Sequence, residues 1–161
     1  MCIRDRVNIY TCKIAKCEII SDSYPITDLP EIGGFSVQST VRKDTDVYSD
    51  TNGENINDVV KGFDLTETSY TKKTYVGYFK LYLKNLMKWM QENKPDEVDQ
   101  FKKDAGAFMK FFLTKKTDDL GFWANSENDT DGYIPWGYWK ENSADGPVFV
   151  YFKHGLNMRK C

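Results

Sequence analysis

The sequence predicts an α+β domain in which short antiparallel strands precede and follow one antiparallel helical hairpin. Two observations carry this prediction. Apolar residues recur at helical spacing through residues 71–116, and segments rich in β-branched and aromatic residues, separated by polar turns, lie on both sides of that region. A length of 161 residues is that of one domain.

The first forty residues favour strands. Residues 7–20 place Val7, Ile9, Ile14, Ile19 and Ile20 in loose alternation, which predicts two short strands or a hairpin. Residues 33–38 predict a further short strand. Residues 1–6, with the sequence MCIRDR, resemble a translated sequencing adapter, so we expect a non-native leader followed by a single domain over residues 7–161.

The next segment is acidic and poor in large apolar side chains. Residues 42–58 have few side chains whose burial would offset the entropy lost on ordering. We therefore expect an extended, mobile acidic loop over about residues 42–58, and a strand over residues 59–65. The acids of the loop are Asp44, Asp46, Asp50, Glu54 and Asp58.

Residues 71–116 predict two consecutive amphipathic helices. Thr71 is a candidate N-cap, flanked by Tyr70 and Tyr75 in the positions of a hydrophobic staple. Pro95 suits the first position of the second helix, and the short link at residues 93–94 forces an antiparallel arrangement. The expected buried stripes are Tyr75, Phe79, Tyr82, Leu86 and Met90, and then Val98, Phe101, Ala105, Phe108 and Phe112.

The last third again favours strands, over residues 121–125, 133–140 and 147–153. Polar turns at residues 126–132 and 142–146 separate them.

Charge is segregated along the chain. Residues 71–116 hold eleven lysines against five acids, a net of +6, whereas the whole chain has a net charge of −2. Lys80, Lys84 and Lys88 form a row on the first helix, away from its apolar stripe. This polarity indicates a surface that docks an acidic partner, although a solvated helix face is the ordinary alternative.

Composition excludes several classes of protein. A pI near 5.5 argues against general nucleic-acid binding. The sequence has no run of 18 apolar residues, so it predicts no membrane span. Without a secretory signal, we expect free thiols and a cytoplasmic, mostly monomeric protein, with Cys161 as a candidate for an intermolecular disulfide.

Signals for metal sites and enzymes are few. Asp129 and Asp131 superficially resemble the start of a calcium loop, but the twelfth position counted from Glu127 is Tyr138, which cannot supply the bidentate carboxylate. His154 is the single histidine, and the glycine after it suggests an exposed turn residue. We therefore expect no catalytic residue and no required cofactor, leaving weak Ca²⁺ binding open.

Three stretches resemble one known family. VNIYTCKIAKCEIISDSY at residues 7–24, VVKGFDLTETSYTKK at 59–73 and YFKHGLNMRKC at 151–161 are similar, in that order, to the translationally controlled tumor protein (TCTP) family. The terminal stretch is the most specific; family members there have a sequence close to FKDGLEMEKC, from which His154, Asn157 and Arg159 differ.

The resemblance implies a β-tent of short antiparallel sheets with a projecting helical hairpin. It implies a cytosolic, non-catalytic protein credited with calcium binding, microtubule binding and growth regulation, and with binding a small GTPase of the Rheb type. The family glutamate linked to the GTPase contact falls on Glu18, and the tubulin-binding region falls on about residues 70–110.

The sequence thus favours an interaction protein that offers Lys80, Lys84 and Lys88 to acidic partners such as tubulin, and Glu18 to a small GTPase. The alternative is a calcium-binding module that uses clustered acids. An enzyme is the third hypothesis, with no residue set to support it.

Overall fold

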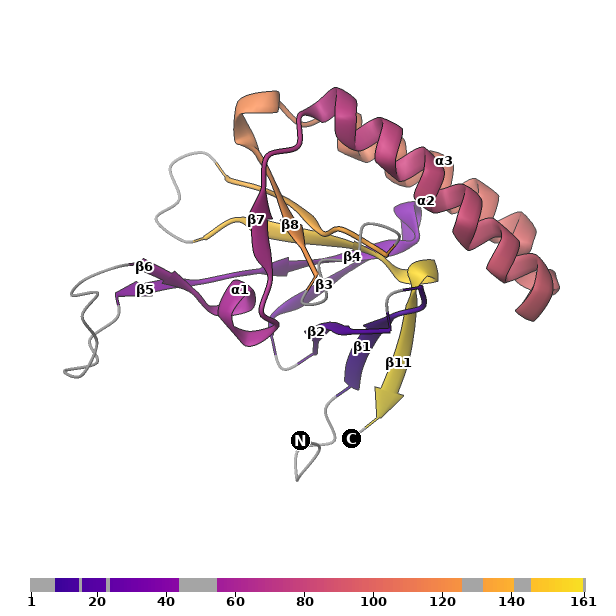
Figure 1. Ribbon diagram of the computed structural model, residues 1–161, viewed down its shortest axis with the longest axis horizontal. Coiled ribbons are helices and arrows are strands. Elements are labelled where there is room, and N and C mark those ends of the chain that lie inside the picture. The colour runs from indigo at the N-terminus through magenta and orange to yellow at the C-terminus, as the bar shows by residue number, and fades with distance from the viewer. Residues whose placement is uncertain are drawn as a thin grey trace.

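The computed structural model describes residues 8–14, 16–22, 24–43, 55–125, 132–140 and 146–160. Within these ranges the strands form three antiparallel sheets, and two long helices lie along one side of the sheet body (Figure 1). The predicted α+β class, with antiparallel sheets and one helical hairpin, is confirmed.

The smaller of the two main sheets joins the beginning and end of the described chain. Its order is β11-β1-β2, so β1 (Asn8–Cys12) lies between β2 (Glu18–Ser21) and β11 (Leu156–Lys160). Cys12 faces Leu156 in the β1–β11 register. The two strands predicted over residues 7–20 are confirmed, whereas β11 is not among the predicted elements.

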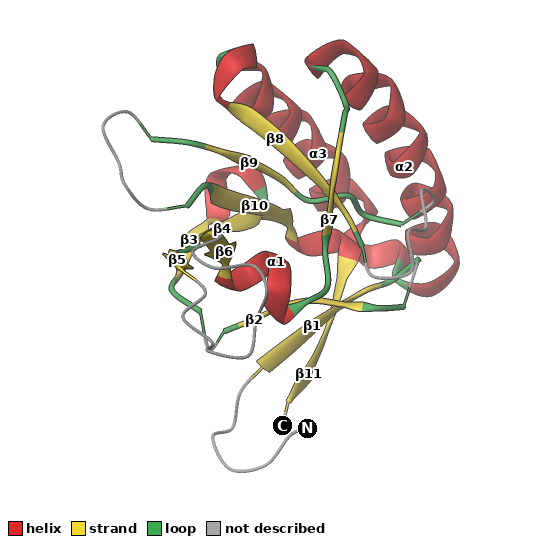
Figure 2. Ribbon diagram, turned by 60° about the vertical axis from the view of Figure 1, so that its left-hand side comes forward, coloured by secondary structure: helices red, strands yellow, loops and turns green. Residues whose placement is uncertain are grey.

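The larger sheet forms the body of the molecule, in the order β3-β4-β10-β9-β8-β7. Its central strand, β10 (Val148–Phe152), is buried at all five positions. Figure 2 shows the two long helices packed beside this sheet. The strands are β3 (Ile26–Leu29), β4 (Gly34–Gln38), β7 (Thr66–Thr68), β8 (Leu120–Ala124), β9 (Trp136–Tyr138) and β10 (Val148–Phe152).

The acidic segment is more ordered at its ends than we expected. β5 (Val41–Lys43) pairs with β6 (Asn55–Asn57), so the two ends of the predicted loop over residues 42–58 are strands; residues 44–54 lie outside the described residues. The strand predicted over residues 59–65 is wrong, because α1 (Asp58–Gly62) occupies it. The Asn57 side chain accepts hydrogen bonds from the backbone N–H groups of Val59 and Val60 at 3.0 and 3.1 Å, which caps this short helix.

The helical hairpin follows the predicted pattern. α2 (Lys72–Asn93) begins at a capping box in which Thr71 and Thr74 exchange side-chain and backbone hydrogen bonds, and the Tyr70 and Tyr75 rings meet edge to face at 6.0 Å. Pro95 begins a 3₁₀ turn, η2 (Pro95–Glu97), which leads into α3 (Val98–Leu113). The predicted stripes are buried, Val98 only in part.

Among the described helices, none combines the length and the apolar character that a membrane span requires. The remaining 3₁₀ turns are η1 (Pro30–Ile32), η3 (Thr117–Asp119) and η4 (Lys153–Gly155).

Aromatic rings of the hairpin pack directly on rings of the sheet body. The ring centroids of Tyr75 and Phe122 are 4.7 Å apart, and those of Phe112 and Trp136 are 4.9 Å apart. The hydroxyl of Tyr75 donates to the carbonyl oxygen of Ile134 at 2.6 Å, whereas the equally buried hydroxyl of Tyr82 has no hydrogen-bond partner in the described part of the chain. Burial raises the pKa of both hydroxyls well above the ordinary value, so both stay protonated at neutral pH.

Tyr75 and Tyr82, on the same face of α2, differ in whether the buried hydroxyl has a hydrogen-bond partner. Removal of the hydroxyl should therefore affect stability differently at the two positions. Tyr75→Phe leaves the buried carbonyl of Ile134 without its donor and should lower the free energy of unfolding by about 1–3 kcal/mol. Tyr82→Phe removes a hydroxyl that has no partner among the described residues, and should change the free energy of unfolding by less than about 0.5 kcal/mol or raise it. Urea unfolding of the two variants measures this. Equal losses in both would contradict the assignment.

Candidate partner-binding surface

The lysine row, defined as Lys80, Lys84 and Lys88, lies on the outer face of α2. At 3.6 residues per turn these positions point roughly opposite to the buried stripe. All three side chains are exposed. Among the described residues no carboxylate lies within 4.0 Å of any of the three ammonium groups, and Glu92, one turn beyond Lys88, makes no ion pair with it. The row therefore remains positively charged at the surface.

The face around the row is partly apolar. Gly77, one turn before the row, has open space around it, and Leu81 beside Lys80 is 66% exposed. An exposed leucine among lysines can pack against the apolar part of a partner while the ammonium groups contact its acids.

Other lysines of the hairpin are already engaged within the molecule. The ammonium of Lys72 donates to the carbonyl oxygens of Leu113 and Lys115 at 2.8 and 2.7 Å, which ties the start of α2 to the end of α3. Lys115 lies over the rings of Phe111 and Tyr138, with its nitrogen 4.6 and 4.0 Å from their centroids, and burial lowers its pKa. The net charge of +6 thus overstates the basic surface that is free to bind a partner.

Glu18 stands apart from the lysine row. It is exposed at the first position of β2, where it pairs with Thr11 next to a shift in the β1–β2 register. β2 belongs to the three-stranded sheet, whereas the lysine row belongs to the helical hairpin, and Figure 1 shows β2 apart from α2. The structure does not bring the two candidate contacts into one site.

The candidate calcium ligands receive no structural test. Asp129 and Asp131 lie outside the described residues, as does most of the acidic segment. Asp58, at its end, accepts hydrogen bonds from the backbone and hydroxyl of Thr40 at 2.8 and 3.0 Å. No group of three His, Cys, Asp or Glu residues suited to a metal ion occurs in the described ranges.

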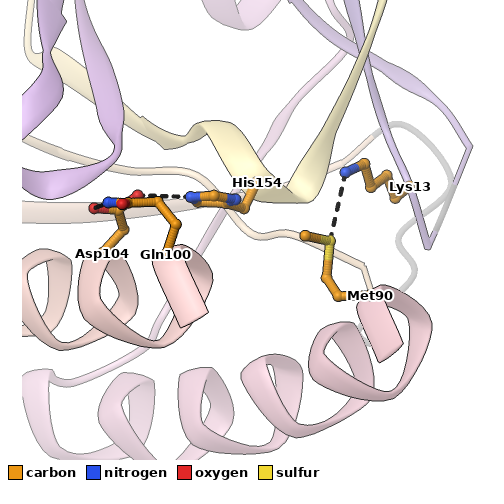
Figure 3. A network of polar contacts seen from close by, with 5 residues as sticks. All are labelled: Lys13, Met90, Gln100, Asp104 and His154. Atoms are coloured by element: carbon orange, nitrogen blue, oxygen red, sulfur yellow. Dashed lines mark hydrogen bonds and ion pairs between the residues drawn. The ribbon is translucent and has the colours of Figure 1, made fainter. Parts of the chain in front are cut away.

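His154 is not the exposed residue that we expected. Its side chain is 15% exposed and its Nε2 lies 2.7 Å from Oδ2 of Asp104, a carboxylate on the buried side of α3 (Figure 3). Gln100 donates to the other oxygen of Asp104 at 2.9 Å, and the rings of Phe101 and Phe152 flank the imidazole. This network joins η4 to α3. The only feature of the sequence that could have indicated this network is an acidic residue, Asp104, directly beside the apolar stripe of the helix.

Gly33 completes the close packing at Asp104. It has a φ of +63°, and a Cβ at this position would lie 2.5 Å from the Cβ of Asp104. Only glycine combines the left-handed conformation with this approach.

The described geometry defines an antiparallel sheet domain that carries one helical hairpin with a free basic face. A family model described as "Translationally controlled tumour protein" matches residues 7–157. The chain belongs to the translationally controlled tumour protein family, and the resemblance noted in the sequence is confirmed.

Individual relatives agree with this assignment. The chain is 34% identical over 162 residues to "Translationally-controlled tumor protein homolog 1" of Dictyostelium discoideum, covering 89% of this chain and 92% of that protein. It is 32% identical over 168 residues to the homolog of Plasmodium chabaudi chabaudi, covering 93% and 97%.

Solved structures share the fold. The Translationally Controlled Tumor-associated Protein p23fyp of Schizosaccharomyces pombe superposes with a TM-score of 0.78 at 25% identity, covering 96% of this chain and 99% of that chain. The NMR structure of TCTP from Caenorhabditis elegans superposes with a TM-score of 0.70 at 23% identity, covering 96% and 98%, and supports the fold alone.

The network at Asp104 yields a stability prediction. Asp104→Ala leaves the side chains of Gln100 and His154 without their shared acceptor and should lower the free energy of unfolding by about 1–3 kcal/mol. Asp99→Ala, at an exposed position of the same helix, is the matched control and should change it by less than about 0.5 kcal/mol. Urea unfolding compares the two; similar small losses would show that the network contributes nothing.

Proposed function

We propose that this chain is a non-catalytic, cytoplasmic interaction protein that binds acidic partners such as tubulin through the lysine row on α2. The observation that carries the proposal is the charge of Lys80, Lys84 and Lys88, which are exposed and have no carboxylate within 4.0 Å in the part of the chain that the structure describes. Membership of the TCTP family supports it, because the region that the family resemblance links to tubulin contains the same row.

The physical basis is complementarity of charge. Tubulin tails are strongly acidic, and a row of three ammonium groups on a straight helix offers repeated contacts to an extended acidic segment. Exposed charges are screened over about 8 Å at physiological ionic strength, so binding of this kind should weaken with added salt.

Charge reversal tests the row. Lys80→Glu with Lys84→Glu should weaken co-sedimentation with microtubules by about tenfold, the equivalent of about 1.4 kcal/mol. Lys61→Glu with Lys140→Glu makes the same change in net charge at exposed positions outside the hairpin and should bind nearly as the parent chain does. Parent-like binding by the first variant would contradict the proposal, as would equal weakening by both.

A second contact is proposed at Glu18, for a small GTPase of the Rheb type. Its exposed position on β2 and the family resemblance support this assignment. Because Glu18 and the lysine row lie on separate surfaces, each partner should bind independently of the other.

Reversal of Glu18 tests this contact. Glu18→Lys should lower affinity for such a GTPase by about tenfold in calorimetry, since one favourable charge contact becomes repulsive, and should leave microtubule binding unchanged. Glu31→Lys, at an exposed position on η1, is the control. Equal affinities of Glu18→Lys and the parent chain would remove Glu18 from the interface.

A calcium-binding module is the competing function. Saturable binding of Ca²⁺ tighter than about 1 mM, abolished by Asp129→Asn with Asp131→Asn, would favour it over the interaction surface.

A further inference from the structure

A cleft of about 610 Å³ lies between the linked end of the helical hairpin and the β10–β11 corner. Its volume is in the range of small-molecule sites. Its lining includes basic, acidic and apolar side chains, and the acids are Glu97 and Asp104. The basic residues are Lys13, Lys94 and Lys153, and the apolar ones are Met90, Leu156 and Met158.

Lys13 is the unusual member of this lining. It follows β1 and is only 6% exposed, and its backbone N–H is anchored to the carbonyl oxygen of Gly155 at 2.9 Å. Its ammonium points toward the Sδ atom of Met90 at 3.9 Å and lies 4.6 Å from the ring centroid of Trp89 (Figure 3). A thioether is a weak acceptor, and an aromatic face replaces only part of the lost hydration.

The carboxylates of the cleft have other partners. Glu97 pairs with Lys94 at 3.6 Å, and Asp104 is held by His154 and Gln100. Across the described ranges, no carboxylate lies within 4.0 Å of the Lys13 ammonium. The C-terminal end of α2 contributes about half a negative charge nearby, which offsets the buried cation only in part.

The charge of Lys13 is correspondingly poorly stabilised. Burial, followed by the like charge of Lys94, lowers the pKa of Lys13 to about 8, and Glu97 opposes this shift. A buried ammonium that borders an open cleft and has no counterion among the described residues creates a place where a bound anion would gain more than at an exposed lysine.

We propose that this cleft binds a small molecule that carries a carboxylate or phosphate group on an apolar body, with Lys13 as the principal contact for the anion. The anionic oxygens would replace the missing counterion, with Lys153 as a second cation at the cleft. The apolar body would lie against Met90, Leu156 and Met158. Neither the lysine row nor Glu18 lines this cleft.

The test uses the full chain, labelled with ¹³C and ¹⁵N, and four probes. Hexanoate and hexyl phosphate carry the two anionic groups, inorganic phosphate lacks the apolar body, and hexanamide lacks the charge. We expect saturable NMR shifts at Lys13 and residues 153–158 with both hexyl anions, and at least tenfold weaker binding of inorganic phosphate and hexanamide. Absence of saturation with both hexyl anions at about 20 mM, or equal binding of hexanamide, would overturn the proposal.

The protonation of Lys13 gives a second readout. Because the anion favours the charged ammonium, the NMR-measured pKa of Lys13 should rise from about 8 toward 10.5 on binding. Affinity should accordingly be greatest below pH 8 and fall as the pH rises above it. Other titratable groups also face the cleft, namely Glu97, Asp104, His154, Lys94 and Lys153. An unchanged pKa of Lys13 in the saturated complex would assign the binding to one of them and overturn the role of Lys13.

Substitution completes the test. Lys13→Met keeps the apolar length of the side chain without its charge and should weaken hexanoate binding at least tenfold, whereas Lys61→Met, an exposed control on α1, should not. Lys13→Arg retains the charge and should retain most of the affinity. Parent-like binding by a folded Lys13→Met protein would contradict the proposal, and the pKa measurement on the parent chain decides the matter if that variant does not fold.

Discussion

Burial of the apolar stripe on α2 is the constraint on which the rest of the structure depends. Five large side chains, from Tyr75 to Met90, are each at most 2% exposed. Burial stabilises the fold by about 1.5–3 kcal/mol for each large apolar side chain removed from water. The conformational preferences of the surface residues are too small to outweigh this burial free energy. The stripe fixes the rotation of the helix about its own axis, and with it the direction in which every other residue of α2 points.

Because the rotation of α2 is fixed, the lysines of the hairpin fall into groups with different surroundings. Lys72 and Lys115, near the open end, are used to close the hairpin and to cover aromatic rings. The lysine row faces solvent, with no counterion among the described residues, and the linked end of the hairpin forms one wall of the cleft beside Lys13. The packing of one helix stripe therefore separates cations that hold the hairpin together, an exposed row of lysines, which is the proposed docking surface, and the buried cation Lys13.

The sequence predicted these features unevenly, for physical reasons. The hairpin, its stripes and the exposed row follow from helical periodicity, which is a local signal, and are confirmed in the structure. The short α1 was missed because the Asn57 cap outweighs the strand propensity of Val59 and Val60. The pairing of β5 with β6 was missed because the acidic segment has few large apolar residues to mark a strand. The pairing of His154 with Asp104 joins residues 50 positions apart, and the burial of Lys13 depends on the packing of α2 over the β1 corner. Neither leaves a periodic trace in the chain.

Lysine footprinting tests the central claim most directly. The chain would be treated briefly with an amine-acylating reagent, alone and with microtubules, and modification at each lysine measured by mass spectrometry. The structure predicts fast labelling of Lys80, Lys84 and Lys88 in the free protein and slow labelling of Lys72. The proposed function predicts that microtubules protect the row alone. Slow labelling of the row in the free protein would contradict the orientation of α2, and unchanged fast labelling beside bound microtubules would contradict its role as the docking surface.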